Sequence, residues 1–158
     1  PLTYHPSPHH SNLLYTIHHT SFSPLNRNGE VTAKLIGGNL SVLYGLQGTP
    51  FSLNKIIDKC EKPPILFIED ISEKHYHIDR MLQNLRMSGV FDRISGLVVG
   101  QFTDCADDVT MGCTLLESIR QVVDSYTFPI LFDYPSGHID SNYPLLFAQE
   151  YCLSVTDF

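Results

Sequence analysis

The chain carries few charged side chains, and few of those are positive. Only 17% of its 158 residues are charged, and 10 Lys and Arg stand against 17 Asp and Glu, which gives a net charge of −7. Proteins bind nucleic acids and anionic membrane surfaces through clusters of Lys and Arg, and the sequence has no such cluster. We therefore expect no nucleic-acid and no membrane partner, and favour a small-molecule or protein partner.

Long hydrophobic runs and paired cysteine motifs are also missing. The longest apolar runs, 65–68 and 145–148, have four residues each, whereas a transmembrane helix needs about 18 or more. The first residues lack the pattern of a signal peptide, so we expect neither a membrane span nor an export signal. The cysteines have no CxxC spacing and are predicted to be free thiols in a reducing compartment: Cys60, Cys105, Cys113 and Cys152.

Length and apolar patterning predict one α/β domain. A chain of 158 residues that is 42% hydrophobic is an ordinary globular domain of the usual ~100–200 residues. Continuous apolar strands separated by amphipathic helices favour a mainly parallel, three-layer arrangement with right-handed crossovers. The predicted elements are a strand at 31–36, a tight turn at Gly37-Gly38, a helix at 40–46 capped by Asn39, a strand at 65–68, a helix at 72–88 with Ser72 as N-cap and Gly89 as stop, a strand at 97–99, a helix at 114–124, a strand at 130–132, and strands at 145–148 and 151–155.

The first thirty residues contain five of the eight histidines among Pro, Ser and Asn. His9-His10 and His18-His19 suggest a metal site, but adjacent imidazoles rarely converge on one ion without Cys or carboxylate ligands nearby. The better interpretation is a semi-extended segment that lies along a partner surface, with one strand at about 12–18.

Polar side chains follow three of the predicted strands. Glu69 and Asp70 follow the strand at 65–68, Asp104 comes after 97–99, and His138 stands in the loop after 130–132. Ligands of parallel α/β sheets gather beyond the carboxyl ends of the strands, so a carboxylate and an imidazole can meet there as half of a nucleophilic triad. The alternative is structural: Asp70 caps the next helix, Glu69 points to water, and His138 is a surface or packing residue.

No nucleophile accompanies this candidate pair. The chain has no Gly-x-Ser-x-Gly elbow, and neither Ser41 nor Ser136 lies in an elbow context. No cysteine has a base near it in the sequence, and no metal-ligand spacing is present. Gly37-Gly38-Asn39 precedes a helix, as phosphate-binding loops do, but lacks their further glycine and lysine.

Six linked motifs make the chain from Val31 onward resemble the C-terminal domain of the LD-carboxypeptidase family, which includes muramoyltetrapeptide carboxypeptidase and the microcin C immunity peptidases. The motifs, in order, are Gly37-Gly38-Asn39-Leu40-Ser41, Gly48-Thr49-Pro50, Leu66-Phe67-Ile68-Glu69-Asp70, Tyr76-x-Ile78-Asp79-Arg80-Met81-Leu82, Gly96-x-x-x-Gly100-x-Phe102, and Pro135-x-Gly137-His138 with Asn142.

The resemblance implies a three-layer β/β/α swivelling-type fold and a Ser–Glu–His triad without cofactor or metal. Glu69 matches the triad acid and His138 the general base. The family's serine lies in an N-terminal domain, so residues 1–30 would be an interdomain segment and 31–158 the C-terminal domain. The serine would then be missing from this chain, and we expect the chain by itself to be inactive.

The resemblance also implies a function for the full-length protein. It would be a cytoplasmic homodimer that hydrolyses the L,D-amide bond of murein peptides and releases terminal D-alanine. Its partners would be the murein peptide and its own N-terminal domain. The alternatives are an amide hydrolase of the microcin-immunity type, or a non-catalytic binding protein that kept the fold.

Overall fold

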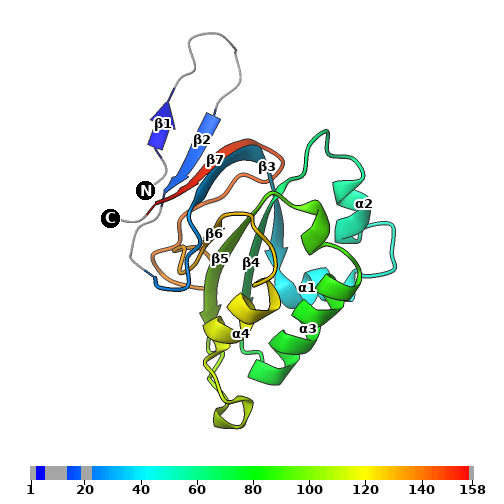
Figure 1. The fold of residues 1–158 in the computed structure, drawn as a ribbon, viewed down its shortest axis with the longest axis vertical. Helices are drawn as coiled ribbons and strands as arrows, with labels where there is room; N and C mark the ends of the chain where they lie inside the picture. Colours follow the sequence, from blue (N-terminus) through cyan, green and yellow to red (C-terminus); the bar gives the residue numbers. More distant parts are fainter. Residues whose placement is uncertain (1–2, 6–13, 19–22, 157–158) are drawn as a thin grey trace.

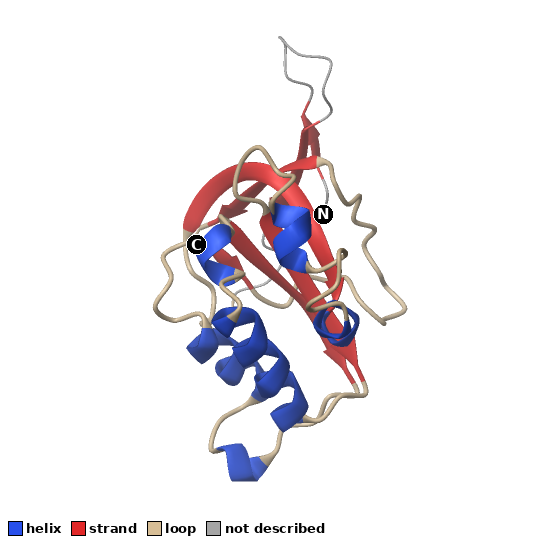
Figure 2. Cartoon of the chain, turned by 90° about the vertical axis from the view of Figure 1, so that its right-hand side faces the viewer, coloured by secondary structure: helices blue, strands red, loops and turns tan. Residues whose placement is uncertain are grey.

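The computed structural model describes residues 3–5, 14–18 and 23–156 of the chain. Its strands form one mixed sheet in the order β1-β2-β7-β3-β4-β5-β6, and the helices pack on one side of it (Figures 1 and 2). The elements are β1 Thr3–His5, β2 Leu14–His18, β3 Gly29–Asn39, α1 Leu40–Gly45, α2 Leu53–Ile57, β4 Ile65–Ile71, α3 His75–Met87, β5 Gly96–Thr103, α4 Leu115–Val122, β6 Ile130–Leu131 and β7 Glu150–Val155, with short 3-10 turns at Phe91–Arg93 and Val109–Met111.

One long strand, β3, connects two parts of the sheet. Its first half, 29–34, pairs antiparallel with β7, and its second half, 35–39, pairs parallel with β4. β2 continues the sheet beyond β7 in parallel, whereas β5 and β6 continue it beyond β4, also in parallel. The sheet bends along β3, so that β7 and β2 lie over the face of the central strands opposite the helices (Figure 1).

The bend creates a separate hydrophobic core on each side of the central strands. On the helical side, α1, α3 and α4 pack against alternate residues of β4 and β5, such as Leu66 and Val99. On the other side, Tyr151 and Leu153 of β7 pack against Phe67 of β4. The expected α/β class with a mainly parallel sheet is confirmed, and the curled end of the sheet supplies the second β layer.

The strongest sequence signals identified the correct central elements. The apolar runs became β4 and β5, whose first residues are fully buried as expected for strands covered on both faces. The predicted apolar stripe of α3, which includes Ile78 and Leu85, is buried against the sheet. Thr114 caps α4 in a capping box with Glu117, and Asn39 caps α1 by accepting from the Val42 N–H.

The predicted tight turn at Gly37-Gly38 is wrong, because both glycines lie within β3. Their φ angles are 131° and 143°, values that glycine adopts readily and other residues do not. Gly37 pairs with Phe67, and a Cβ on Gly37 would lie 2.0 Å from the Phe67 carbonyl oxygen. The two glycines therefore allow close contact between neighbouring backbones instead of reversing the chain.

Two further boundaries differ from the prediction. Ser72 is not the N-cap of α3: its N–H donates to the Thr103 carbonyl and extends the β4–β5 pairing, and Lys74 takes the cap position. The expected strand at 145–148 does not form. Pro144 has no N–H to donate, and Ala148 adopts a φ of 64° that turns the chain into β7.

The first thirty residues contribute β1, β2 and the beginning of β3 to this domain. β2 pairs with β7, and Ile17 is fully buried in the core beneath it. His9, His10 and His19 lie outside the described residues. Within the described ranges, no group of three metal-ligating side chains converges, and no helix is long and apolar enough to cross a membrane. The four cysteines are free thiols, as predicted.

Gly37→Ala and Gly38→Ala form a matched pair that tests the close contact between β3 and β4. Both substitutions place an alanine at a positive φ, which costs about 1–2 kcal/mol. Only the Gly37 Cβ meets backbone, whereas a Cβ on Gly38 meets no atom within 4 Å. We expect Gly37→Ala to lower the free energy of unfolding in urea by at least ~2 kcal/mol more than Gly38→Ala. Equal losses would contradict the contact.

Candidate active site

The structure brings Glu69 and His138 into contact. Glu69 lies near the carboxyl end of β4, and His138 lies in the loop that follows β6. The His138 Nδ1 atom is 2.8 Å from Glu69 Oε2. The Glu69 side chain is 9% exposed and that of His138 is 49% exposed. The interaction therefore joins a buried carboxylate to an imidazole whose outer part is accessible.

Strand alternation determines where Glu69 points. Phe67 and Glu69 are two residues apart in β4, and Phe67 belongs to the core on the side away from the helices. Glu69 therefore also faces away from the helices, toward a pocket of about 410 Å³. The residues that line this pocket are Gly38, Phe67, Glu69, Ser136, Gly137, His138, Asn142, Tyr143, Pro144, Leu145 and Phe147.

The loop that carries His138 is held by backbone hydrogen bonds. The Gln101 N–H of β5 donates to the Ser136 carbonyl at 2.9 Å, and the Gly137 N–H donates to Asn142 Oδ1 at 3.2 Å. Gly100 makes this contact possible, because a Cβ there would lie 2.4 Å from the Ser136 carbonyl oxygen. His138 is thus attached to the end of the neighbouring strand.

Tyr134 packs beneath the same loop. Its ring is fully buried, and among the described residues its hydroxyl has no hydrogen-bond partner. Burial raises the pKa of Tyr134 to about 12. The phenol therefore stays protonated at neutral pH and fills the core instead of exchanging protons.

The hydrogen bond between Glu69 and His138 has a definite chemical consequence. An ionised carboxylate can only accept, so the proton of a neutral His138 resides on Nδ1 and the lone pair on Nε2. No described side chain bonds Nε2, which leaves it available as a base at the pocket. When the ring takes up a proton, the adjacent Glu69 stabilises the positive charge.

Asp70 has a different role from that of its neighbour. It is 1% exposed and faces the helices, where its carboxylate accepts from Asn39 Nδ2 at 2.8 Å and from the Ser41 N–H at 2.9 Å. The structural alternative was thus correct in part: Asp70 binds a helix N-terminus, but that of α1, which precedes it. The expectation that Glu69 would then point to water is wrong.

The described residues place no nucleophile beside His138. Ser41 donates to Asn39 Oδ1 at 2.7 Å on the other side of the sheet. Ser136 lies in the same loop as His138, but its hydroxyl has no hydrogen bond to that ring. The Gly37-Gly38-Asn39 motif forms the end of β3 and the cap of α1, not a phosphate-binding loop.

The sequence assigned no role to several residues that organise this edge. Gln101 and Gly100 position the His138 loop through backbone contacts, which single-residue patterns do not indicate. His75 is buried on the helical side, where its Nε2 lies 2.7 Å from Ser118 Oγ and its Nδ1 accepts from the Asp108 N–H. Its position at the first turn of α3 gave no signal of this network.

Asp70→Asn tests whether the buried carboxylate holds the start of α1 on β4. The substitution replaces one acceptor oxygen with an NH₂ group that faces an N–H donor. We expect the free energy of unfolding to fall by about 2–3 kcal/mol, measured by urea denaturation. Asp140→Asn, in an exposed loop, is the control and should change it by less than about 0.5 kcal/mol. Equal effects in the two variants would show that the network contributes no stability.

Comparison with known proteins connects this geometry to one family. Residues 32–153 match the family model described as the LD-carboxypeptidase C-terminal domain. The chain is 36% identical over 114 residues to the "Probable murein peptide carboxypeptidase" of Bacillus subtilis, covering 70% of the chain and 33% of that protein. It is 30% identical over 113 residues to the microcin C7 self-immunity protein MccF of Escherichia coli, covering 70% of the chain and 30% of MccF.

Solved structures show the same likeness. The crystal structure of muramoyltetrapeptide carboxypeptidase from Oxalobacter formigenes matches with a TM-score of 0.62 and 29% identity, over 74% of this chain and 38% of that one. MccF in complex with aspartyl sulfamoyl adenosine matches with a TM-score of 0.56 and 27% identity, over 69% of this chain and 31% of that one. The chain thus spans about a third of the length of the relatives it matches.

Proposed function

The chain belongs to the LD-carboxypeptidase family, in which it corresponds to the C-terminal domain, and we propose that it supplies the acid and the base of a serine peptidase centre. Relatives of the chain are named as carboxypeptidases, which supports a peptidase function for the protein. The observation that carries the proposal is the 2.8 Å contact between His138 Nδ1 and Glu69 Oε2 at the carboxyl edge of the sheet.

The mechanism follows from the free Nε2 of His138. This atom takes the proton of a serine hydroxyl as the serine oxygen attacks the scissile carbonyl, and then gives the proton to the departing amine. The same nitrogen activates the water that hydrolyses the acyl-enzyme. Glu69 keeps the ring in the required tautomer and stabilises the imidazolium, without itself taking the proton.

The serine, on this proposal, lies in a part of the full-length protein that corresponds to the two thirds of the Bacillus subtilis relative that the chain does not match. Residues 31–158 then form most of the domain that presents Glu69 and His138 to the nucleophile. Residues 1–30 connect it to the nucleophile domain and add β2 to its sheet. The proposed substrate is a murein peptide, which the name of the Bacillus subtilis relative supports. The residue that this peptide loses is, on this proposal, a terminal D-alanine. We further propose that the protein acts as a cytoplasmic homodimer.

A second substrate class has support from the likeness to MccF, whose structure holds aspartyl sulfamoyl adenosine. An amide hydrolase of that kind would use the same Glu–His pair on a peptide–nucleotide conjugate. The two classes are separated by giving the full-length protein a murein tetrapeptide and an aminoacyl sulfamoyl adenosine under the same conditions. We expect faster turnover of the tetrapeptide, and the reverse order would assign the protein to the second class.

Glu69→Gln and His138→Ala test the proposed acid and base in the full-length protein. Release of D-alanine from a murein tetrapeptide should fall by about a thousandfold or more in each variant, because each change removes part of one proton-transfer unit. Glu61→Gln and His77→Ala change the same residue types outside the pocket and should keep near wild-type rates. Wild-type turnover by either Glu69→Gln or His138→Ala would refute the assignment, and inactivity of the wild type itself would favour a binding protein.

The 158-residue chain on its own should release no D-alanine from the same peptide. It holds the proposed base and acid but no described hydroxyl bonded to His138. The full-length protein, assayed in parallel, is the positive control. Turnover by the isolated chain that disappears in Ser136→Ala would instead place the nucleophile within this domain.

A further inference from the structure

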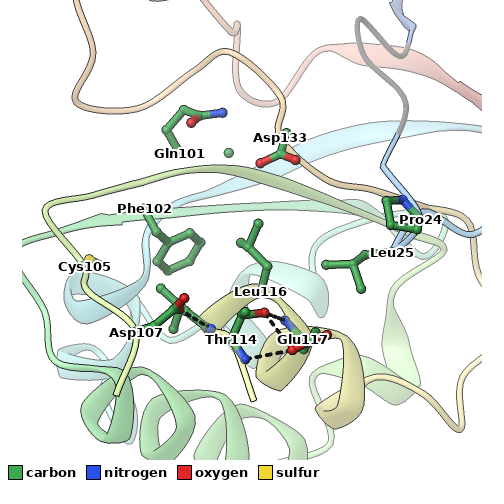
Figure 3. Close-up of a pocket in the computed structure, with 12 residues that line it drawn as sticks. Pro24, Leu25, Gln101, Phe102, Cys105, Asp107, Thr114, Leu116, Glu117 and Asp133 are labelled. Atoms are coloured by element: carbon green, nitrogen blue, oxygen red, sulfur yellow. Dashed lines mark hydrogen bonds between the residues drawn. The ribbon is translucent and has the colours of Figure 1, made fainter. Parts of the chain in front are cut away.

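A second pocket opens on the helical side of the sheet (Figure 3). It has a volume of about 410 Å³ and shares no lining residue with the pocket at Glu69 and His138. Leu25, Phe102 and Leu116 supply much of its apolar surface, and it lies between the end of β5 and the start of α4. Pockets of this size that combine apolar walls with a few polar groups are typical sites for small molecules.

Asp133 stands out on the wall of this pocket, opposite Leu116 (Figure 3). It lies two residues after the end of β6 and is only partly exposed, and its carboxylate forms no hydrogen bond or ion pair with any described residue. Its φ is 58°, a left-handed conformation that costs a non-glycine residue energy. Burial raises the pKa of the Asp133 carboxyl, as expected for an acid without a compensating partner. The described part of the fold therefore holds this acid in a left-handed backbone conformation without a partner for its carboxylate.

The other polar groups of the pocket already have partners in the chain. Glu117 Oε2 accepts from the Thr114 N–H at 2.8 Å, and Asp107 Oδ1 accepts from the Leu115 N–H at 2.7 Å. The N-terminus of α4 is thus occupied by carboxylates of the protein. Among the residues that the structure describes, no Lys, Arg or His lines the pocket, so the charged side chains that an anionic ligand would meet there are all negative.

We propose that this pocket binds a compact primary amine, whose ammonium group pairs with the Asp133 carboxylate and whose apolar body packs against Phe102 and Leu116. An ammonium supplies both the charge and the hydrogen-bond donors that Asp133 lacks. Transfer of the apolar body from water to the surface formed by Phe102 and Leu116 lowers the free energy of the complex. This proposal is independent of the proposed peptidase function, because the two pockets have no residue in common.

Amide chemical shifts of the 158-residue chain, titrated with n-butylamine at neutral pH, test the proposal. We expect saturable shifts at Phe102, Leu116 and Asp133, with a Kd in the millimolar range or below. The neutral analogue n-butanol should bind about tenfold more weakly or worse, and butyrate should not bind. Asp133→Asn should weaken butylamine binding by about tenfold or more, whereas Glu61→Gln, an exposed acid outside the pocket, should leave it unchanged.

Three outcomes of this titration would overturn the proposal. They are shifts scattered over surface carboxylates, equal binding by the Asp133→Asn variant, or no saturable shift at all.

Asp133→Gly provides an independent measurement, because glycine accepts the positive φ. We expect it to abolish butylamine binding and to raise the unfolding temperature. In the wild type the folded state holds the carboxyl proton more tightly than the unfolded state, so stability is lost as the pH rises above the ordinary Asp pKa of 3.8. The advantage of Asp133→Gly should therefore grow with pH over that range. If the unfolding temperature does not rise in Asp133→Gly, the fold already stabilises the Asp133 carboxylate and the proposal fails.

Discussion

The register of β3 on β4 is the constraint on which the site depends. Gly37 lies opposite Phe67, and this pairing places Asn39 opposite Glu69 at the end of the two strands. Side chains of a strand alternate between faces, so a slip of one residue would move Glu69 to the helical side and Asp70 to the pocket. Only glycine at position 37 allows the Phe67 carbonyl to come so close. The close approach of two backbones thereby determines which carboxylate meets His138.

The two neighbouring acids, Glu69 and Asp70, lie on opposite faces of the sheet and make different contacts there. Asp70 is buried, and its carboxylate accepts hydrogen bonds from Asn39 and from the start of α1. We therefore expect substitutions of Asp70 to lower the stability of the fold. Glu69 has its 2.8 Å contact with a half-exposed ring, and that ring keeps its outer nitrogen at the pocket. Asp70 connects the end of β4 to α1, and the role that we propose for Glu69 and His138 is proton transfer.

The central elements of the fold could be predicted from local patterns. Continuous apolar runs identified β4 and β5, because these strands are buried on both faces of the sheet. One apolar stripe identified α3, because the helix buries only the face that packs against the sheet. Ligands gather at the carboxyl ends of parallel strands, and this rule selected Glu69, Asp70, Asp104 and His138 as side chains that could meet, without deciding which acid meets the imidazole. The resemblance to a known family added the roles proposed for them, and the family itself is confirmed.

The remaining features depend on contacts between segments distant in the sequence. Gly37-Gly38 has the local sequence of a turn, and only the contact with the β4 backbone shows why two glycines are needed within a strand. Ser72 extends β4 because its N–H donates to the Thr103 carbonyl. The bend of the sheet along β3 arises from pairing with β7, more than a hundred residues away. Asp133 simply follows a predicted strand in the sequence. Only the structure shows its left-handed backbone and that no described residue pairs with its carboxylate.

The most direct test of the account is a double-mutant cycle on the full-length protein, because the central claim is that Glu69 acts through His138. The kcat for D-alanine release is measured for Glu69→Gln, His138→Ala and the variant with both changes. If the carboxylate acts only on the ring, the double variant is as slow as His138→Ala alone. If the two losses multiply, the residues act independently and the proposed acid–base unit does not exist.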